Sequence, residues 1–184
     1  MRIIRLVALL GLVAGGAWAV VQETPYLALG EKAPPFAGKG TDGKDYDLAA
    51  LTKEKPVFVV FWKERCPHNK SASELINTIQ QAYAGKVQMV GVVNASGDGA
   101  KSWVDQFGLK YPLLPDQSKE TIRAYKVVYS ICTMQIGVDG KIVKVFEGYG
   151  ADAMKQLSEA MAAVAGVQPA SVDLTGAPGR RTWG

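Results

Sequence analysis

Histidine and cysteine are scarce in this chain, so few side chains are available for metal or nucleophilic chemistry. Among its 184 residues there are one histidine, His68, and two cysteines, Cys66 and Cys132. A single histidine forms neither a catalytic triad nor a multi-histidine metal site. A copper or zinc site built from these three residues would need all of them to converge, which the sequence does not guarantee. We therefore predict neither a metal nor another cofactor.

The sequence also lacks the patterns of nucleotide and nucleic-acid binding. The segment Gly97-Asp98-Gly99 has no phosphate-loop pattern around it. The net charge is only +4, and Arg2 and Arg5 near the N-terminus supply two of these charges. We find neither a basic stripe with interleaved aromatic residues nor an internal repeat. These absences argue against a nucleic-acid partner.

Residues 1–19 are typical of a secretory signal peptide. Two arginines precede an apolar stretch, and Ala17-Trp18-Ala19 fits a cleavage site. We predict cleavage after Ala19; the alternative is an uncleaved membrane anchor, because residues 6–22 carry no charge. No cysteine follows the apolar stretch, which argues against a lipoprotein anchor. Both interpretations place the protein in the periplasm or another extracytoplasmic compartment, where a disulfide persists.

Residues 30–165 are predicted to form one α/β domain, preceded by a linker over residues 20–29. Apolar patterns of strand and helix period alternate, with strands over residues 57–62, 87–93, 111–114, 133–138 and 142–146 and helices over residues 69–84, 99–107, 118–125 and 152–164. This alternation predicts a central mixed sheet with helices on both faces. The turn at Asp139-Gly140 predicts a C-terminal antiparallel hairpin. Residues 166–184, rich in Gly, Pro, Ser and Thr, are predicted to be a flexible tail.

Cys66 is the most informative residue, because it stands between an apolar strand and a helix. The dipole and the free N–H groups at the start of a helix favour a thiolate, and Lys63, Arg65 and His68 add positive charge nearby. A dithiol redox site carries its second cysteine three residues later, where this chain has Asn69. The segment therefore has the frame of a Cys-x-x-Cys motif with one thiol missing.

Four motifs in this order resemble the thioredoxin-like redoxin superfamily. The closest branch is the exported thiol-disulfide oxidoreductases of the TlpA and ResA type, which are related to the AhpC/TSA peroxiredoxins. The motifs are Gly30-x-x-Ala33-Pro34-x-Phe36, Phe61-Trp62 followed by Cys66-Pro67, Tyr111-Pro112-Leu113-Leu114-Pro115-Asp116, and Asp139-Gly140-Lys141-Ile142. The resemblance covers residues 30–164. It implies a thioredoxin-like fold and protein or small-molecule thiols and disulfides as partners.

Three departures from this family affect the predicted chemistry. Asn69 replaces the second cysteine, and Ile131 stands where the family has a cis-proline. A cis bond before a residue other than proline costs about 3–4 kcal/mol, so we expect a trans bond and a reshaped loop. The threonine and the arginine that peroxiredoxins use to bind peroxide correspond to Lys63 and Ile131. Efficient peroxidase activity is therefore not expected.

The resemblance implies a role for each residue around Cys66. Cys66 is the expected catalytic nucleophile, and Cys132 is the expected second catalytic thiol, which resolves it through a Cys66–Cys132 disulfide. Two alternatives remain open: a permanent structural disulfide, closing a loop of about 65 residues, and two unpaired cysteines. The supporting residues are Trp62 to shield the thiol, Pro67, His68 to stabilise the thiolate, Asn69 to tune Cys66 or cap the helix, and Ile131.

The sequence thus predicts an exported thioredoxin-like thiol-disulfide oxidoreductase. One alternative is a peroxiredoxin-like thiol peroxidase with antioxidant activity, which uses the same Cys66. The other is a non-catalytic binding module of the same fold, in which a Cys66–Cys132 disulfide is only structural.

Overall fold

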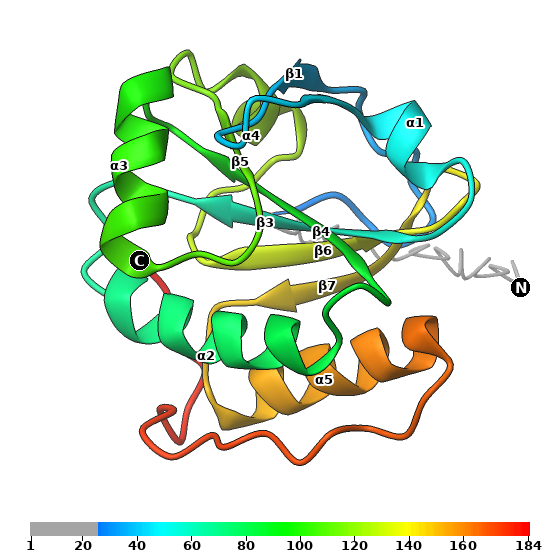
Figure 1. Cartoon of the computed structure of the whole chain (residues 1–184), viewed down its shortest axis with the longest axis vertical. Coiled ribbons are helices and arrows are strands. Elements are labelled where there is room, and N and C mark those ends of the chain that lie inside the picture. Colours follow the sequence, from blue (N-terminus) through cyan, green and yellow to red (C-terminus); the bar gives the residue numbers. More distant parts are fainter. Residues whose placement is uncertain (1–25) are drawn as a thin grey trace, which may run out of the picture.

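The computed structural model describes residues 26–184, which form a central sheet with helices on both faces (Figure 1). The elements in chain order are β1 (Ala37–Lys39), β2 (Asp45–Asp47), α1 (Leu48–Thr52), β3 (Val57–Trp62), α2 (Asn69–Ala82), β4 (Gln88–Val93), α3 (Gly97–Phe107), β5 (Leu113–Pro115), α4 (Glu120–Ala124), β6 (Cys132–Ile136), β7 (Ile142–Glu147) and α5 (Ala151–Ala165).

The central sheet has five strands in the order β5-β4-β3-β6-β7. Strands β3, β4 and β5 run parallel, whereas β6 pairs antiparallel with β3 and with β7. All six residues of β3 are apolar and buried, as a central strand covered on both faces requires. The predicted mixed sheet with a C-terminal antiparallel hairpin is confirmed, including the turn at Gly140, whose φ of 72° suits glycine.

Two core clusters lie on opposite faces of the sheet. The first core cluster joins the sheet to α2, α3 and α5, and the second joins it to α1, α4 and the segment around residues 26–36. Alternate residues of β3 divide between them, with Phe58, Val60 and Trp62 in the first and Val57, Val59 and Phe61 in the second. This alternation fixes which side chains can reach the loop before α2, where Cys66 lies.

The N-terminal predictions fall mostly on residues that the structure does not describe. The predicted signal peptide, residues 1–19, and the first part of the linker lie outside the described residues. Tyr26 and Leu27, at the end of the predicted linker, are buried in the second core cluster. Within residues 26–184, no helix is long and apolar enough to cross a membrane.

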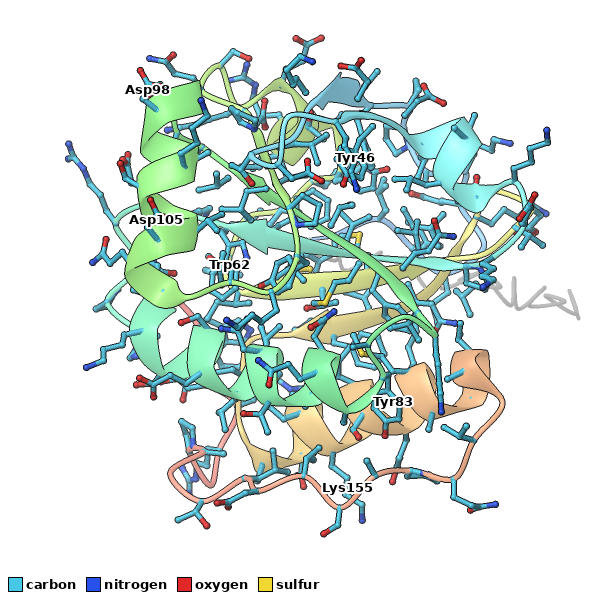
Figure 2. The ribbon with its side chains drawn as sticks, in the orientation of Figure 1. Tyr46, Trp62, Tyr83, Asp98, Asp105 and Lys155 are labelled. Carbon is cyan, nitrogen blue, oxygen red and sulfur yellow. The ribbon has the colours of Figure 1, made fainter. Side chains whose placement is uncertain are left out.

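The segment after α5 packs against the domain, unlike the flexible tail that we expected. Residues 167–184 run back along α5 and rise toward the start of α2 (Figure 1). The Ala170 N–H donates a hydrogen bond to the Tyr83 hydroxyl (N–O 2.8 Å), and Val172, Leu174 and Ala177 pack against the first core cluster. Figure 2 shows Tyr83 between α2 and α5. These contacts escaped the sequence analysis because they follow no helix or strand period.

The peptide bond between Ser130 and Ile131 is cis, which corrects our expectation of a trans bond. Our expectation considered only the intrinsic preference of a peptide bond before a residue other than proline. In the structure, tertiary contacts hold both Ser130 and Ile131. The Ile131 side chain is fully buried in the first core cluster, and its carbonyl accepts a hydrogen bond from Gly148 N–H (N–O 2.6 Å). The Ser130 hydroxyl accepts one from Lys63 N–H (N–O 3.1 Å). The loop before β6 is thereby joined to the loop after β3.

Candidate active site

Cys66 lies in the loop between β3 and α2, at the predicted strand-to-helix junction. Its N–H donates to the Lys63 carbonyl (N–O 3.0 Å), and its own carbonyl accepts from Asn69 N–H (N–O 3.3 Å). These turns place the thiol just before the first residue of α2. The side chain is only 8% exposed, so a reaction partner has a narrow approach.

Asn69 holds this loop together. Its side chain is 4% exposed, and Nδ2 donates to the carbonyls of Lys63 (2.9 Å) and Glu64 (3.4 Å). The N-cap of α2 is His68, so Asn69 binds the loop and is not itself the cap residue. Its Oδ1 is buried and has no hydrogen-bond partner among residues 26–184. Asn69 therefore replaces the missing cysteine with a donor that fixes the backbone around Cys66.

Cys66 opens onto a hollow of about 590 Å³, which we call the Cys66 hollow. Its lining consists of Lys63, Glu64, Arg65, Cys66, Pro67, Asn94, Lys119 and Gly184. Three of these side chains are cationic and one is anionic, so the hollow carries positive charge next to the thiol. Burial and the charge of Lys119 lower the pKa of Lys63, while Cys66 acts to raise it. Lys63 also donates a hydrogen bond from Nζ to the Val128 carbonyl.

His68 is directed toward Tyr149. The His68 Nδ1 and the Tyr149 hydroxyl are 3.3 Å apart, and the two ring centroids are 5.6 Å apart. This pair, in which Tyr149 is buried and His68 half-buried, ties the start of α2 to the segment between β7 and α5. Pro67 and Arg65 are exposed at the surface of the loop.

Trp62 and Ile131 support the site from the core. Trp62 is fully buried (Figure 2). Its ring packs against Trp103 of α3, with centroids 5.8 Å apart. Both Trp62 and Ile131 belong to the first core cluster, and neither lines the Cys66 hollow. We expected Trp62 to shield the thiol, but Trp62 is not among the residues that line the hollow next to Cys66.

Cys132 lies in the core of the sheet. It pairs with Phe61 of β3, is fully buried, and belongs to the second core cluster, on the face opposite Trp62. Both cysteines are free thiols in this structure. Burial, and after it the charge of Glu147, raises the pKa of Cys132 well above its ordinary value. Within the described residues, Cys66, His68 and Cys132 do not gather into a metal-binding group.

Several residues of the site gave no sequence signal. Lys119, Asn94 and Gly184 line the hollow, and Ser130 supports the loop, yet none belongs to a motif around Cys66. The Asn94 side chain accepts a hydrogen bond from Glu64 N–H (N–O 2.7 Å). Asn94 comes directly after β4, at the carboxyl end of a strand that runs parallel to β3. This position is the one feature that could have indicated Asn94 as a site residue.

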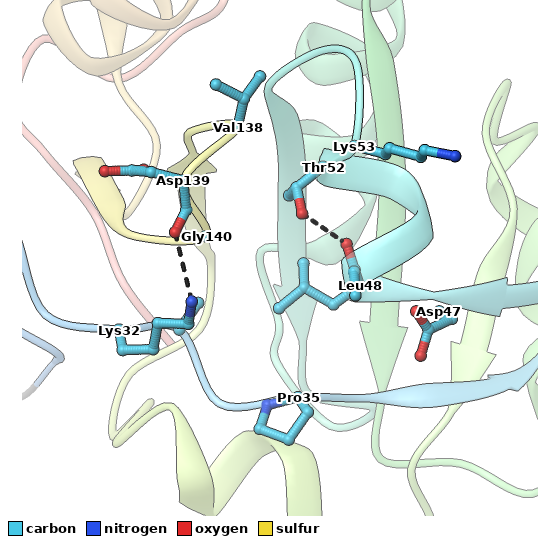
Figure 3. Close-up of a pocket in the computed structure, with 11 residues that line it drawn as sticks. Lys32, Pro35, Asp47, Leu48, Thr52, Lys53, Val138, Asp139 and Gly140 are labelled. Atoms are coloured by element: carbon cyan, nitrogen blue, oxygen red, sulfur yellow. Dashed lines mark hydrogen bonds between the residues drawn. The ribbon is translucent and has the colours of Figure 1, made fainter.

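Figure 3 shows a second hollow, of about 420 Å³. Its lining includes Thr52 and Lys53, which come before the start of β3, whereas Cys66 follows the end of that strand. Lys32, Leu48, Thr52 and Val138 are among the residues around it. The Lys32 ammonium donates to the Asp139 carbonyl there (Nζ–O 3.4 Å). This hollow contains no thiol, so we assign the chemistry to the Cys66 hollow.

Comparison with known proteins agrees with this geometry. The model of the AhpC/TSA family matches residues 29–145. The thiol-disulfide oxidoreductase ResA of Bacillus subtilis (strain 168) is 30% identical over 138 residues, which cover 74% of this chain and 76% of that protein. ResA of Bacillus anthracis is 31% identical over 120 residues, covering 64% and 69% of the two chains.

Solved structures show the same fold. A Chlorobium tepidum protein assigned as the thiol:disulfide interchange protein DsbE superposes with a TM-score of 0.66 at 25% identity, covering 76% of this chain and 99% of that one. The peroxidoxin BcpB of Mycobacterium tuberculosis, at 16% identity, shares the fold with a TM-score of 0.60, covering 76% of this chain and 97% of that one. The chain belongs to the AhpC/TSA family, has a thioredoxin-like fold, and is similar to the ResA thiol-disulfide oxidoreductases.

Proposed function

We propose that this protein is a thiol-disulfide oxidoreductase whose nucleophile is Cys66. The observation that carries the proposal is the position of Cys66 at the start of α2, opening onto a hollow with Lys63, Arg65 and Lys119. The hollow places positive charge next to the sulfur, and the thiolate is the form of cysteine that attacks a disulfide. The names of the ResA relatives support the same reaction.

The reaction is an exchange in two steps. The Cys66 thiolate attacks one sulfur of a substrate disulfide, forms a new S–S bond with it, and releases the other sulfur as a thiolate. A second thiolate, from an outside thiol, then attacks the substrate sulfur of this mixed disulfide and returns Cys66 as a thiolate. Electrons and atoms balance, because one disulfide is consumed and one is formed.

We assign the second step to an outside protein or small-molecule thiol. Cys132 remains an alternative resolving thiol, but it is fully buried in the second core cluster, so its use would require the loop and β6 to open. Asn69 stands where the dithiol motif would supply an internal thiol. We therefore treat Cys66 as a monothiol that depends on its partner for release.

Thiol peroxidation is the weaker use of the same cysteine. The loop offers the Lys63 side chain where a peroxiredoxin has threonine, and Ile131 where it has arginine. The Ile131 side chain is fully buried, so it presents nothing to a peroxide. We propose disulfides, rather than peroxides, as the substrates.

We also propose that the protein works outside the cytoplasm. The support is the signal-peptide pattern of residues 1–19 and the redox chemistry of the domain, which suits an oxidising compartment. Expression in a bacterial host with mass spectrometry of the purified protein tests this. A mature chain starting at Val20 supports export by cleavage, and an intact N-terminus recovered with the membrane fraction supports the anchor.

The test of the reaction is turnover of oxidised glutathione with 2-mercaptoethanol as the outside thiol that releases Cys66 from the mixed disulfide, and the reduced glutathione released is measured. We expect the Cys66→Ser variant to lose turnover and to form no mixed disulfide, as judged by intact mass. Circular dichroism confirms that the variant is folded. Turnover that survives in folded Cys66→Ser protein would refute the proposal.

A further inference from the structure

Residues 178–184, which we call the strap, pair with the backbone on both sides of the active site. Tyr149 and Thr182 exchange two hydrogen bonds, with N–O distances of 2.9 and 2.8 Å. Ser130 and Gly184 exchange two more, of 2.9 and 2.5 Å. Such reciprocal pairs are those of adjacent antiparallel strands. The strap is thus added to the backbone next to the cis bond at Ile131.

The end of the strap lies against the sulfur of Cys66. A Cβ atom on Gly184 would overlap Cys66 Sγ and would stand 2.9 Å from Cys66 Cβ. Only a residue without a side chain fits at this point. Attack on a disulfide requires the substrate sulfur to reach Sγ, and the backbone of Gly184 closes the approach from this side of the hollow while the strap is in place.

The strap is held less firmly than the segment before it. Residues 170–177 pack against the first core cluster, whereas Trp183 and Gly184 are exposed and Thr182 is half-buried. Its ion pair between Arg181 and Glu147 has a distance of 4.0 Å, and the two side chains are 41% and 36% exposed, so it contributes little. The backbone hydrogen bonds of the strap join its residues to the buried residues Tyr149 and Ser130, and a segment with few buried apolar contacts of its own opens locally at less cost than the core.

We propose that the strap is a displaceable cover that regulates access to Cys66. With the strap in place, the thiol is shielded, and both backbone groups of Ser130 are occupied. With the strap released, Cys66 Sγ and the Ser130 N–H and carbonyl become available together to a substrate. The regulatory role rests on the proposed function of Cys66, but the cover itself is a statement about accessibility alone.

Two variants release the strap by different means. Gly184→Ala places a methyl group where Cys66 Sγ lies, and Thr182→Pro removes the N–H that donates to the Tyr149 carbonyl. Gly179→Ala is the matched control, because a Cβ at Gly179 meets no atom within 4 Å. The full chain is treated with iodoacetamide, and modification of Cys66 and Cys132 is followed separately by peptide mass spectrometry.

We expect alkylation of Cys66 to become roughly tenfold faster in Gly184→Ala and Thr182→Pro, the effect of losing one or two backbone hydrogen bonds. Gly179→Ala should match the unaltered chain. Cys132, which is fully buried, should stay unmodified in all of them and so reports that each variant is folded. A strap variant counts as folded when Cys132 stays unmodified. If the alkylation rate of Cys66 is unchanged in a folded strap variant, the proposal is overturned.

Exchange with oxidised glutathione, measured on the same proteins, separates this proposal from the proposed function. If the strap variants are alkylated faster but no protein exchanges with glutathione, the strap covers Cys66 and the proposed oxidoreductase function is wrong. If the unaltered chain exchanges with glutathione and all the proteins are alkylated at equal rates, the proposed oxidoreductase function stands and the strap does not cover Cys66. We expect both rates to rise together in the two strap variants.

Discussion

The side-chain amide of Asn69 donates a hydrogen bond to the carbonyl of Lys63, with an Nδ2–O distance of 2.9 Å. This contact spans the loop that carries Cys66 and comes from the position where a dithiol motif has its second cysteine. The amide at this position therefore holds the loop around Cys66. It cannot supply the thiolate that would release a mixed disulfide from within the motif.

Asn69→Cys should restore that release. Oxidised glutathione would convert the Cys66 thiol and the thiol introduced at position 69 into an internal disulfide, with two molecules of reduced glutathione released. Because the second thiolate is then part of the protein, we expect the mixed disulfide at Cys66 to be short-lived and turnover to rise about tenfold or more. Intact mass after quenching with acid distinguishes the internal disulfide from bound glutathione. Accumulation of the glutathione adduct in Asn69→Cys would contradict this prediction.

Removing Cys132 should leave the exchange reaction intact. Its sulfur is buried in the second core cluster, where burial and Glu147 raise its thiol pKa and keep it protonated at neutral pH. We expect Cys132→Ala to keep its exchange rate within about twofold and to lose about 1 kcal/mol of stability from the small cavity. Urea unfolding and the glutathione assay measure the two effects. A loss of turnover as large as that of Cys66→Ser would instead identify Cys132 as the resolving thiol.

The charge of the Cys66 hollow should select among small disulfides. Lys119 lines the hollow, and burial, and after it the charge of Lys119, lowers the pKa of Lys63. The two ammonium groups repel each other and together attract anions. We expect Lys119→Gln to reduce the preference for oxidised glutathione over the cationic disulfide cystamine by roughly threefold, as for one partly exposed charge.

The preference for oxidised glutathione should also weaken as salt is added. Lys155→Gln is the matched control, because Lys155 is exposed on α5, away from the sheet (Figure 2). The comparison of kcat/KM for the two disulfides checks the prediction. If Lys119→Gln changes kcat/KM equally for both disulfides, or if Lys155→Gln changes the preference as much as Lys119→Gln does, the charge of Lys119 does not act at the site.

Sequence patterns predicted the elements that position Cys66, because local rules govern them. The apolar run of β3, the helix that follows it and the Asp139-Gly140 turn each have a period or a residue preference that is visible in the sequence. The five-residue helix α1 was missed, although Asp47 caps it by accepting a hydrogen bond from Ala50 N–H (N–O 2.9 Å). So short a helix leaves no apolar period to detect.

The features that depend on distant backbone groups could not be predicted. The pairing of Ser130 with Gly184 uses only N–H and carbonyl groups, which every residue except proline offers, so it leaves no mark on residue type. The cis bond before Ile131 likewise depends on contacts with Lys63 and Gly148, each far from it in the sequence. The cover over Cys66 is therefore a property of the tertiary structure alone.

The Tyr83 hydroxyl contributes to the docking of the segment after α5, beside the apolar contacts of that segment. It lies 2.8 Å from Ser158 Oγ and accepts a hydrogen bond from Ala170 N–H at the same distance. Tyr83→Phe keeps the buried ring but leaves the Ser158 hydroxyl and the Ala170 N–H without this partner. We expect a loss of about 1–3 kcal/mol in the free energy of unfolding, together with faster hydrogen exchange at Ala170.

Tyr129→Phe is the matched control for Tyr83→Phe, because the Tyr129 side chain is 50% exposed. Groups next to an exposed tyrosine can form hydrogen bonds with water when its hydroxyl is removed. It should change stability by less than about 0.5 kcal/mol. Since Tyr83 and Ser158 share one hydrogen bond, Ser158→Ala should cost less in the Tyr83→Phe background than in the unaltered chain. Strict additivity of the two substitutions would show that the hydroxyl pair does not connect α2 to α5, and that the segment is held by its apolar contacts instead.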